Sequence, residues 1–284
     1  MTYHHIQRYN SLRFLADLVV DHSSEQYLRN GVQVPESCHR LPKHVSAGIR
    51  IFVKTDLLKT LLPYLSSVSH PFHLLTGSSD LQGCPDANFA RDLKHSTKIC
   101  SWAGTNLPEF EAWMLSVPIG LEEHGRELSK PELTSFDCRP MYERDIHIFC
   151  PYFSNTHPTR QVDLSTIRSM RSPEIKVCNS FLPPSEYKRF LSKSTYTVCL
   201  RGNGIDTIRI YESLLSGSIP IVLKSPLWHM HREVGCTILN DLEELLSLPS
   251  SVTDPNDLRK KSYKFLTEIP ERITNHQVRF FRKI

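Results

Sequence analysis

Short apolar runs alternate with polar, turn-rich segments along most of the chain, and this pattern predicts buried β-strands. Each run is short, is enriched in Val, Ile, Leu and Phe, and is followed by a polar or glycine-containing turn. The connections between the runs have the length of βαβ units, so we expect an α/β fold with parallel sheets. The predicted strands are residues 49–55, 71–80 with a polar turn at its end, 98–104, 114–118, 146–153, 177–181, 196–200, 219–223 and 236–240.

Helical spacing of leucines and valines predicts several helices between and around these strands. Residues 11–20 place Leu12, Leu15, Leu18 and Val19 on one face of a helix. Asp56 is the expected N-cap of a helix that ends at residue 65. Two separate closing helices are expected over residues 256–268 and 271–283.

A polar segment divides the chain into two α/β halves. Residues 125–144 are loop-like and contain Pro131 and Pro140. We therefore expect an N-terminal domain over residues 1–140, and a C-terminal domain with the closing helices over residues 141–284.

Composition limits the class of protein. The 284 residues are 39% hydrophobic and 23% charged, with a mild net charge of +4 that suits a small anionic ligand and does not indicate nucleic acid. The apolar run at residues 14–20 is interrupted by Asp17 and falls far below the ~18 apolar residues of a membrane span. A soluble, cytoplasmic protein without a membrane span is the expectation.

Cysteine and histidine spacing does not indicate a disulfide framework or a metal site. The eight cysteines form no CxxC pair, which favours free and mostly buried thiols. The close histidine pairs, His4–His5 and His229/His231, have no cysteine or carboxylate at ligand spacing. No metal ligands are therefore assigned.

Residues 196–223 carry the strongest candidate site. An apolar strand is followed by the turn Arg-Gly-Asn-Gly at 201–204, a helix over 207–216 and a second strand. Such a turn opens onto a helix N-terminus, whose free N–H groups and dipole suit a phosphate. Arg201 and Arg209 add positive charge, and Glu212 lies on the same helix face as Arg209, where its carboxylate suits a ribose diol.

This turn matches neither the GxGxxG fingerprint nor the Walker A motif. Taken alone, Gly202 and Gly204 are explained by a tight turn, and Arg209 with Glu212 by a surface ion pair. The combination favours a nucleotide-diphosphate site. Residues 154–160 add Thr156 and Arg160 as further phosphate contacts, with a capped loop before a helix as the equal alternative. The expected nucleotide-binding set is Thr156, Arg160, Arg201, Gly202, Asn203, Gly204, Thr207, Arg209 and Glu212.

Polar groups after strands in the N-terminal half are the candidates for acid–base chemistry. Asp80 closes the polar turn at 76–80, just past a strand end, and Glu122, Glu123 and His124 follow the strand at 114–118. A carboxylate there suits a general base that deprotonates an acceptor hydroxyl. An ordinary turn or an N-cap explains Asp80 equally simply, and spacing does not choose among the three residues at 122–124.

The run CLRGNGIDTIRIYESLLSGSIPIVLKSPL at 199–227 resembles the nucleotide-sugar-binding segment of exostosin-type glycosyltransferases. That family shows an Arg-Gly turn, a helix with Arg-x-x-Glu, and then a Leu, a Gly and a Pro-Ile/Val-Val strand. The matching positions are Arg201, Gly202, Arg209, Glu212, Leu215, Gly217, Pro220 and Val222. The resemblance is specific over this segment and weaker over the rest of residues 48–230.

The resemblance implies two Rossmann-like domains of GT-B type with the active site in the interdomain cleft. It also implies a UDP-sugar donor and inversion at the anomeric carbon, commonly without a metal. Arg201, Arg209 and the helix N-terminus would stabilise the leaving diphosphate, and Glu212 would hold the ribose. Asp80 is the expected catalytic base, with Glu123 and His124 in reserve.

Upstream strand-end motifs are similar to family members from microbes and large algal viruses. Similarity to viral xylosyltransferases of this family implies UDP-xylose as donor and a fucose of an N-glycan as acceptor, with a glycan or glycoprotein as partner. Animal and plant relatives usually carry a membrane anchor, which this sequence does not show.

Two other functions stay open. One is a non-catalytic UDP- or glycan-binding protein on the same scaffold. The other is a different nucleotide-diphosphate enzyme such as an epimerase, against which the missing GxGxxG fingerprint argues. A serine hydrolase is disfavoured because no GxSxG is present.

Overall fold

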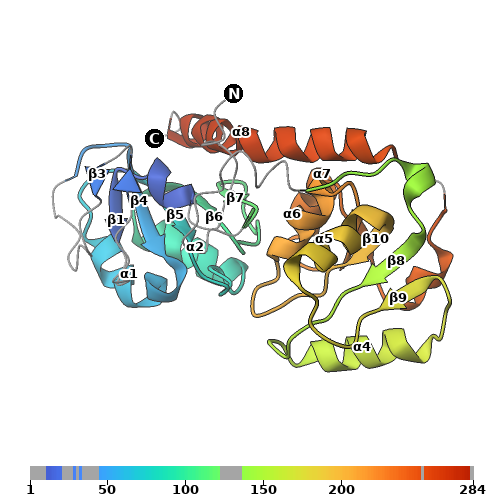
Figure 1. The fold of residues 1–284 in the computed structure, drawn as a ribbon. Helices are drawn as coiled ribbons and strands as arrows, with labels where there is room; N and C mark the ends of the chain where they lie inside the picture. Colours follow the sequence, from blue (N-terminus) through green and yellow to red (C-terminus); the bar gives the residue numbers. More distant parts are fainter. Residues whose placement is uncertain are drawn as a thin grey trace. The chain divides into compact units, whose positions relative to one another are not determined.

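The computed structural model describes residues 11–20, 28–29, 32–33, 45–121, 136–250 and 253–281. The chain divides into two compact units, each built on a five-stranded sheet (Figure 1). Of the described residues, those from 11 to 119 and from 269 to 281 form the N-terminal unit, and those from 120 to 268 form the C-terminal unit. The predicted α/β class with two parallel sheets is confirmed; the domain boundary at residue 140 stays a prediction.

The sheet of the N-terminal unit is parallel throughout and runs in the order β1-β4-β5-β6-β7. Every residue of β5 and β6 is buried, which explains why these strands read as continuous apolar runs. A separate antiparallel pair joins β2 to β3. The strands are β1 (Leu18–Val20), β2 (Leu28–Arg29), β3 (Val32–Gln33), β4 (Ile49–Lys54), β5 (Phe72–Gly77), β6 (Ile99–Gly104) and β7 (Met114–Ser116).

The helix predicted over residues 11–20 is wrong. The 3-10 turn η2 (Ser11–Leu15) leads instead into β1, whose residues pair with Ile51–Val53 of β4. The run Leu18–Val20 is too short to distinguish strand from helix by periodicity, and pairing with a buried neighbour decides the outcome.

Connections in the N-terminal unit also differ from expectation at Asp56. This residue lies inside the 3-10 turn η3 (Thr55–Leu57), and α1 (Leu58–Ser66) begins without a side-chain cap. The predicted N-cap is therefore wrong. A helix that the hydrophobic pattern did not reveal, α2 (Ala87–Ser96), is capped by Asp86, whose Oδ1 accepts the N–H of Phe89 at 2.9 Å.

The C-terminal unit has a second parallel sheet in the order β12-β11-β10-β8-β9. The predicted strand at 219–223 is confirmed with its bounds. The strand predicted at 146–153 ends three residues earlier, and the strands predicted at 177–181 and 196–200 each begin two residues earlier. The strands are β8 (Ile146–Cys150), β9 (Ile175–Val177), β10 (Ser194–Val198), β11 (Ile219–Leu223) and β12 (Thr237–Leu239).

Helices cover both faces of this second sheet (Figure 1). Ile148 and Cys150 of β8 pack with Leu164 and Ile167 of α4 (Thr159–Ser169), while Phe149 packs with Leu191 of α5 (Pro184–Lys193). Because neighbouring residues of a strand face opposite sides, α4 and α5 lie on opposite faces. The remaining elements are η4 (Met141–Glu143), α6 (Ile208–Leu215), α7 (Trp228–Val234) and η5 (Glu243–Ser247).

The two expected closing helices form one helix, α8 (Pro255–Phe281), so the predicted break is wrong. Pro270 lies inside it, at the point where the chain passes from the C-terminal to the N-terminal unit. Leu266, Ile269 and Ile273 are all at most 2% exposed, so packing on both sides of Pro270 keeps the helix continuous.

Further expectations concern cysteines and membranes. The seven cysteines in the described part of the chain are free, and all except Cys138 are buried. No helix among the described residues is long and apolar enough to cross a membrane.

Candidate functional site

The candidate site lies at the topological switch point of the C-terminal sheet. Strands β8 and β10 are neighbours, but the chain leaves β8 toward β9 and leaves β10 toward β11. The loops at residues 151–158 and 199–207 therefore diverge at the carboxyl ends of these strands, where open α/β sheets bind their ligands. Both segments singled out by the sequence, 154–160 and 201–204, meet at this position.

Arg160 ties the two loops together. Its Nε donates to the carbonyl of Arg201 at 2.6 Å and its Nη2 to the carbonyl of Leu200 at 3.3 Å. Its Nη1 donates to the carbonyl of Ser154 at 3.0 Å and to Thr156 Oγ1 at 2.6 Å. Arg160 is 7% exposed, so the structure places it beneath the loops as a clamp.

Gly202 lets the two loops approach closely. A Cβ at this position would lie 3.0 Å from Arg160 Nη2 and 3.3 Å from Thr156 Oγ1. The Gly202 N–H donates to the carbonyl of Gly204 at 3.0 Å, and this bond closes a tight turn. Arg201 and Asn203, by contrast, are exposed on the turn. The turn therefore needs glycine at 202 for packing, and it presents Arg201 to solvent.

Arg209 extends the positive charge along the first turn of α6. Its guanidinium carbon lies 4.2 Å from the ring centre of Phe153, which Arg160 also approaches at 5.2 Å. Its Nη2 donates to the carbonyl of Tyr152 at 3.4 Å, while its Nε is buried without a hydrogen-bond partner. Burial alone lowers the pKa of Arg209, but Tyr187, Cys199 and Glu212 reverse the sign and raise it, so the side chain is cationic.

Glu212 is held by a residue that the sequence analysis missed. The hydroxyl of Tyr187 on α5 donates to Glu212 Oε2 at 3.0 Å. Burial and the nearby carboxylate hold the pKa of Tyr187 well above its ordinary value, so Tyr187 remains a donor. The Glu212 carboxylate is thus orientated from a neighbouring helix. No sequence signal links residues 187 and 212, because the contact depends on how α5 packs against α6.

The start of α6 contains the predicted Thr207 and, beside it, a buried group that was not predicted. Thr207 is the N-cap residue, yet it makes no side-chain cap, and its Oγ1 is buried without a partner. The preceding Asp206 is 2% exposed and contacts Tyr211 and His231. An acidic residue directly before a predicted helix was the available signal.

In the N-terminal unit, Asp80 lies exposed on a turn at the carboxyl end of β5. Ser78 has a left-handed φ of 53°, uncommon for a residue other than glycine, and accepts a 2.9 Å hydrogen bond from Nε of the buried Arg13. Ser79 Oγ donates to Asp56 and accepts the Leu81 N–H at 3.0 Å. The residues before Asp80 are therefore fixed on both sides.

The end of the next strand has related features. Asn106, after β6, also has a left-handed φ, of 49°, and Thr105 has a buried hydroxyl without a partner. Unusual backbone conformations cluster at functional sites more often than elsewhere. This edge of the N-terminal sheet is therefore a second place where polar groups gather.

The predicted site residues separate into three groups. The nine predicted nucleotide-binding residues all belong to the two loops, to the first turn of α4 and to α6 of the C-terminal unit: Thr156, Arg160, Arg201, Gly202, Asn203, Gly204, Thr207, Arg209 and Glu212. Asp80 belongs to the N-terminal unit. Glu123 and His124 lie outside the described residues. Within the described ranges, no three His, Cys, Asp or Glu side chains form a group that could hold a metal ion.

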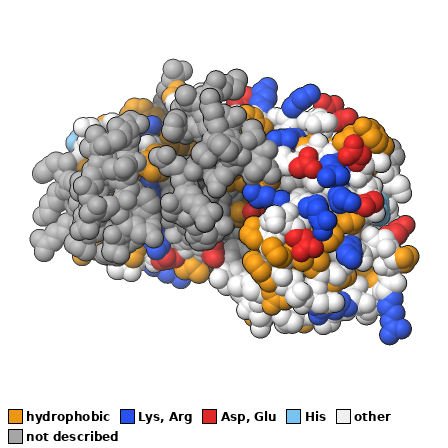
Figure 2. All heavy atoms as spheres, in the orientation of Figure 1, with side chains coloured by type: hydrophobic (Ala, Val, Ile, Leu, Met, Phe, Trp, Pro, Cys, Tyr) orange, Lys and Arg blue, Asp and Glu red, His pale blue; other side chains and the backbone are white. Residues whose placement is uncertain are grey.

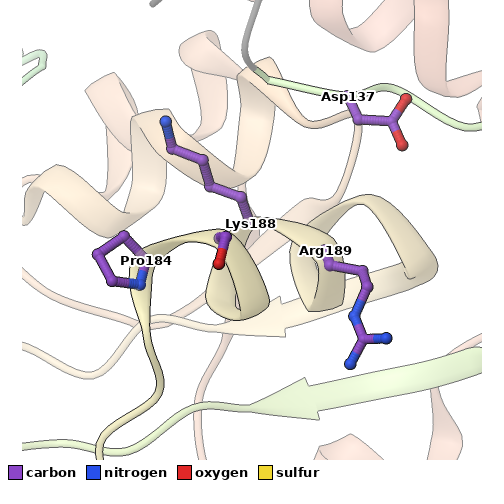
Figure 3. A pocket seen from close by; sticks show the side chains of 5 residues that line it. Asp137, Pro184, Lys188 and Arg189 are labelled. Atoms are coloured by element: carbon purple, nitrogen blue, oxygen red, sulfur yellow. The ribbon is translucent and has the colours of Figure 1, made fainter.

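Two surface depressions of the described structure lie elsewhere. One, of about 420 Å³, is lined by Asp137, Pro184, Ser185, Lys188 and Arg189. Figure 3 shows that its Lys188 and Arg189 side chains point apart, so they do not converge on one anion. The other, of about 500 Å³, lies at the amino end of β4 and β5, beside Arg50 and His73.

Surface charge in the C-terminal unit is mixed. On the face shown in Figure 2, its Lys and Arg side chains are interspersed with Asp and Glu. This distribution agrees with the scattered charges of the sequence, and no single-sign patch dominates the described part of that face.

No protein-family model matches the sequence, and no curated protein matches it significantly. The crystal structure of AviGT4, a glycosyltransferase involved in avilamycin A biosynthesis, is 8% identical, with 83% of this chain and 86% of that chain aligned and a TM-score of 0.40. An α1,3-fucosyltransferase is 11% identical, with 93% and 79% aligned and a TM-score of 0.42. Scores below 0.5 give these likenesses no weight for mechanism or substrate.

Proposed function

We propose that the protein is a glycosyltransferase that uses a UDP-sugar as donor. The observation that carries the proposal is the arrangement at the switch point of the C-terminal sheet. There the β10–α6 loop presents Arg201, the first turn of α6 presents Arg209, and Glu212 is fixed one turn further along the same helix. Cations followed by a fixed carboxylate suit a nucleoside diphosphate, whose phosphates and ribose are neighbours.

The phosphates are the part of the donor that this arrangement would stabilise most. In the transfer step, the bond between the anomeric carbon and the diphosphate oxygen breaks, and negative charge grows on the departing UDP. Arg201, Arg209 and the free N–H groups at the start of α6 would stabilise this charge. The buried Thr207 hydroxyl adjoins the same helix end.

The ribose hydroxyls would donate to the carboxylate of Glu212. Tyr187 donates to Oε2 and orients the carboxylate that is proposed to accept from the diol. A carboxylate held from the side by a tyrosine loses less side-chain entropy when it binds the ribose.

Arg160 and Gly202 have a different role in this proposal. Four hydrogen bonds of Arg160 go to groups of the loops themselves, and Gly202 packs against it. We therefore assign Arg160 and Thr156 to the positioning of the loop, and Arg201 and Arg209 to contact with the donor.

Asp80 is the proposed general base. It would remove the proton of the acceptor hydroxyl as that oxygen attacks the anomeric carbon, with inversion there. The fixed turn formed by Ser78 and Ser79 supports this choice, because a base must be held in one position. Glu123 and His124 remain reserve candidates for the same step.

The finer parts of the proposal rest on sequence resemblance. These are membership in the exostosin-type family, a GT-B active site between the domains, xylose as the transferred sugar and a fucose of an N-glycan as acceptor. The run at 199–227 supports the family, and the upstream motifs support the xylosyl donor.

A nucleotide-release assay with a panel of UDP-sugars and fucose-containing glycan acceptors tests the function. Acceptor-dependent release of UDP, greatest with UDP-xylose, is the expected result. UDP binding without release from any donor and acceptor would instead favour the non-catalytic binding protein. Absence of UDP binding would contradict both.

A further inference from the structure

The loop at residues 199–207 is held at its far end by a buried carboxylate. Asp206 Oδ2 accepts the hydroxyl of Tyr211 at 2.6 Å, and Oδ1 accepts the N–H of Thr207 at 3.0 Å. His231 Nε2 lies 3.2 Å from Oδ1, with side-chain exposures of 2% for His231 and 0% for Asp206. These contacts connect the loop to both α6 and α7.

The direction of these hydrogen bonds follows from the chemistry of the carboxylate. An ionised carboxylate only accepts, so Nε2 of His231 carries the hydrogen that points at Asp206. Nδ1 of His231 is buried without a partner, so this imidazole is committed to Asp206 alone. A buried carboxylate that loses such donors is strongly destabilised, which makes the arrangement hard to exchange for another.

Apolar packing supports the same connection. Ile205, the residue before Asp206, forms a small buried cluster with Leu227 and Met230 at the start of α7. Residues 205 and 206 are therefore anchored to α7 by an apolar side chain and by a charged one. The opposite end of the loop, at residues 200 and 201, is anchored by Arg160. The turn between the two anchors alternates the exposed Arg201 and Asn203 with the buried Gly202 and Gly204.

We propose that Asp206, with Tyr211 and His231, is a positioning group that holds the loop in its donor-binding form before the donor arrives. This inference rests on the proposed function for its consequence in UDP binding. A loop fixed at both ends loses little entropy on binding, so the buried pair contributes to affinity without touching the donor. Asp206 is thus distinct from Arg201, Arg209 and Glu212, which are assigned direct contacts.

Two measurements on the full chain test this role: the UDP dissociation constant by calorimetry, and amide hydrogen exchange of residues 200–207. Asp206→Ala is expected to weaken UDP binding about tenfold or more and to speed exchange in the loop, because three donors lose their acceptor. Tyr211→Phe keeps the carboxylate and removes one donor, so a smaller loss of about two- to fivefold is expected.

Ser101→Ala is the matched control for general destabilisation. It removes a buried hydrogen bond of similar kind, between Ser101 Oγ and His73 Nδ1 at 2.8 Å, in the other unit. It should lower the melting temperature and leave both UDP affinity and exchange in the loop unchanged.

The outcomes separate the two proposals. A folded Asp206→Ala protein with wild-type loop exchange and UDP affinity would overturn the positioning role, as would equal losses in Ser101→Ala. If Asp206→Ala does not fold, Tyr211→Phe decides by the same two measurements. A wild-type protein that does not bind UDP would overturn the proposed function and the link to affinity, while the exchange experiment would still show whether Asp206 fixes the loop.

Discussion

Tyr187 and Glu212 are joined by a hydrogen bond of 3.0 Å between α5 and α6. The bond explains why Glu212 is not simply the partner of Arg209 on a helix surface: each has its own contact, Glu212 with Tyr187 and Arg209 with Phe153 and the Tyr152 carbonyl. Tyr187 and Glu212 also raise the pKa of Arg209, so the two side chains expected to bind the nucleotide interact through one connected group.

Glu212→Ala is expected to weaken UDP binding by roughly tenfold, because the ribose loses a charged hydrogen-bond acceptor. Tyr187→Phe should have a smaller effect, since the carboxylate remains but is less well orientated. Calorimetric titration with UDP measures both. An unchanged affinity in Glu212→Ala would remove the ribose assignment, and UMP, which lacks the second phosphate, should show the same dependence on Glu212.

Asp80→Asn should lower the transfer rate by about 10²- to 10⁴-fold, which is the usual contribution of a general base. The affinity for UDP should stay the same, because Asp80 belongs to the other unit. Transfer rates and UDP titration on the same preparation test this. Near-normal turnover would show that Asp80 is not the general base. Glu123→Gln and His124→Gln are then the variants to measure.

Acid is expected to destabilise the protein through His73. Burial, followed by the nearby positive groups His276, Arg50 and Lys94, lowers the pKa of His73 to about 4 in the folded state, against 6.5 ordinarily. The unfolded chain therefore takes up the proton first as pH falls. The stabilisation is complete above about pH 6.5 and is lost between about pH 6.5 and 4.

Urea unfolding at pH 7 and pH 5 measures this effect. Wild type should lose about 2 kcal/mol of unfolding free energy through His73 over this interval. His73→Asn cannot titrate and can still bond to Ser101, so its loss should be smaller by that amount. Equal losses in both proteins would show that His73 is not the group responsible.

Gly202→Ala is expected to displace Arg160, because the added methyl group would lie 3.0 Å from Nη2. The predicted result is a several-fold weaker affinity for UDP with a loss of stability of about 1 kcal/mol. Gly83→Ala in the other unit is the control, since its Cβ would lie 3.3 Å from the Trp102 ring. That variant should alter the melting temperature only; a matching change in UDP affinity would argue against the Arg160 clamp.

Thiol reactivity checks the packing of both sheets. Burial raises the pKa of Cys84, Cys150 and Cys199 to about 12, so at pH 8 these thiols are protonated and unreactive. A chromogenic disulfide reagent should modify the half-buried Cys138 of the native protein and should reach these three only after unfolding. Peptide mapping identifies the labelled residues. Rapid labelling of Cys199 in native protein would contradict the described packing behind the loop.

The central strands of both sheets were predictable because β5, β6 and β10 are buried along their whole length, and buried parallel strands are continuous apolar runs. The loops that follow these strands were expected close together because parallel strands bring their carboxyl ends to one edge of the sheet. Thr156, Arg160 and Arg201 could thus be expected at one site from the pattern alone.

The contacts within the site could not be predicted in the same way. Asp206 and His231 are 25 residues apart in the sequence, and so are Glu212 and Tyr187. Whether the two residues of each pair come into contact depends on which face of the sheet each helix covers. The helix prediction for residues 11–20 was wrong for a related reason. Pairing with β4 stabilises Leu18–Val20 more than the continuation of a short helix would.

Helix α8 has a consequence for how the protein is made. Its residues from Ile269 onward belong to the N-terminal unit, where His276 Nε2 hydrogen-bonds the Trp113 carbonyl at 2.9 Å and Phe280 packs against the core. A ribosome reaches these residues only after it has synthesised the whole C-terminal unit. The N-terminal unit can therefore complete its packing only after α8 is synthesised, whereas the sheet of the C-terminal unit can fold during translation.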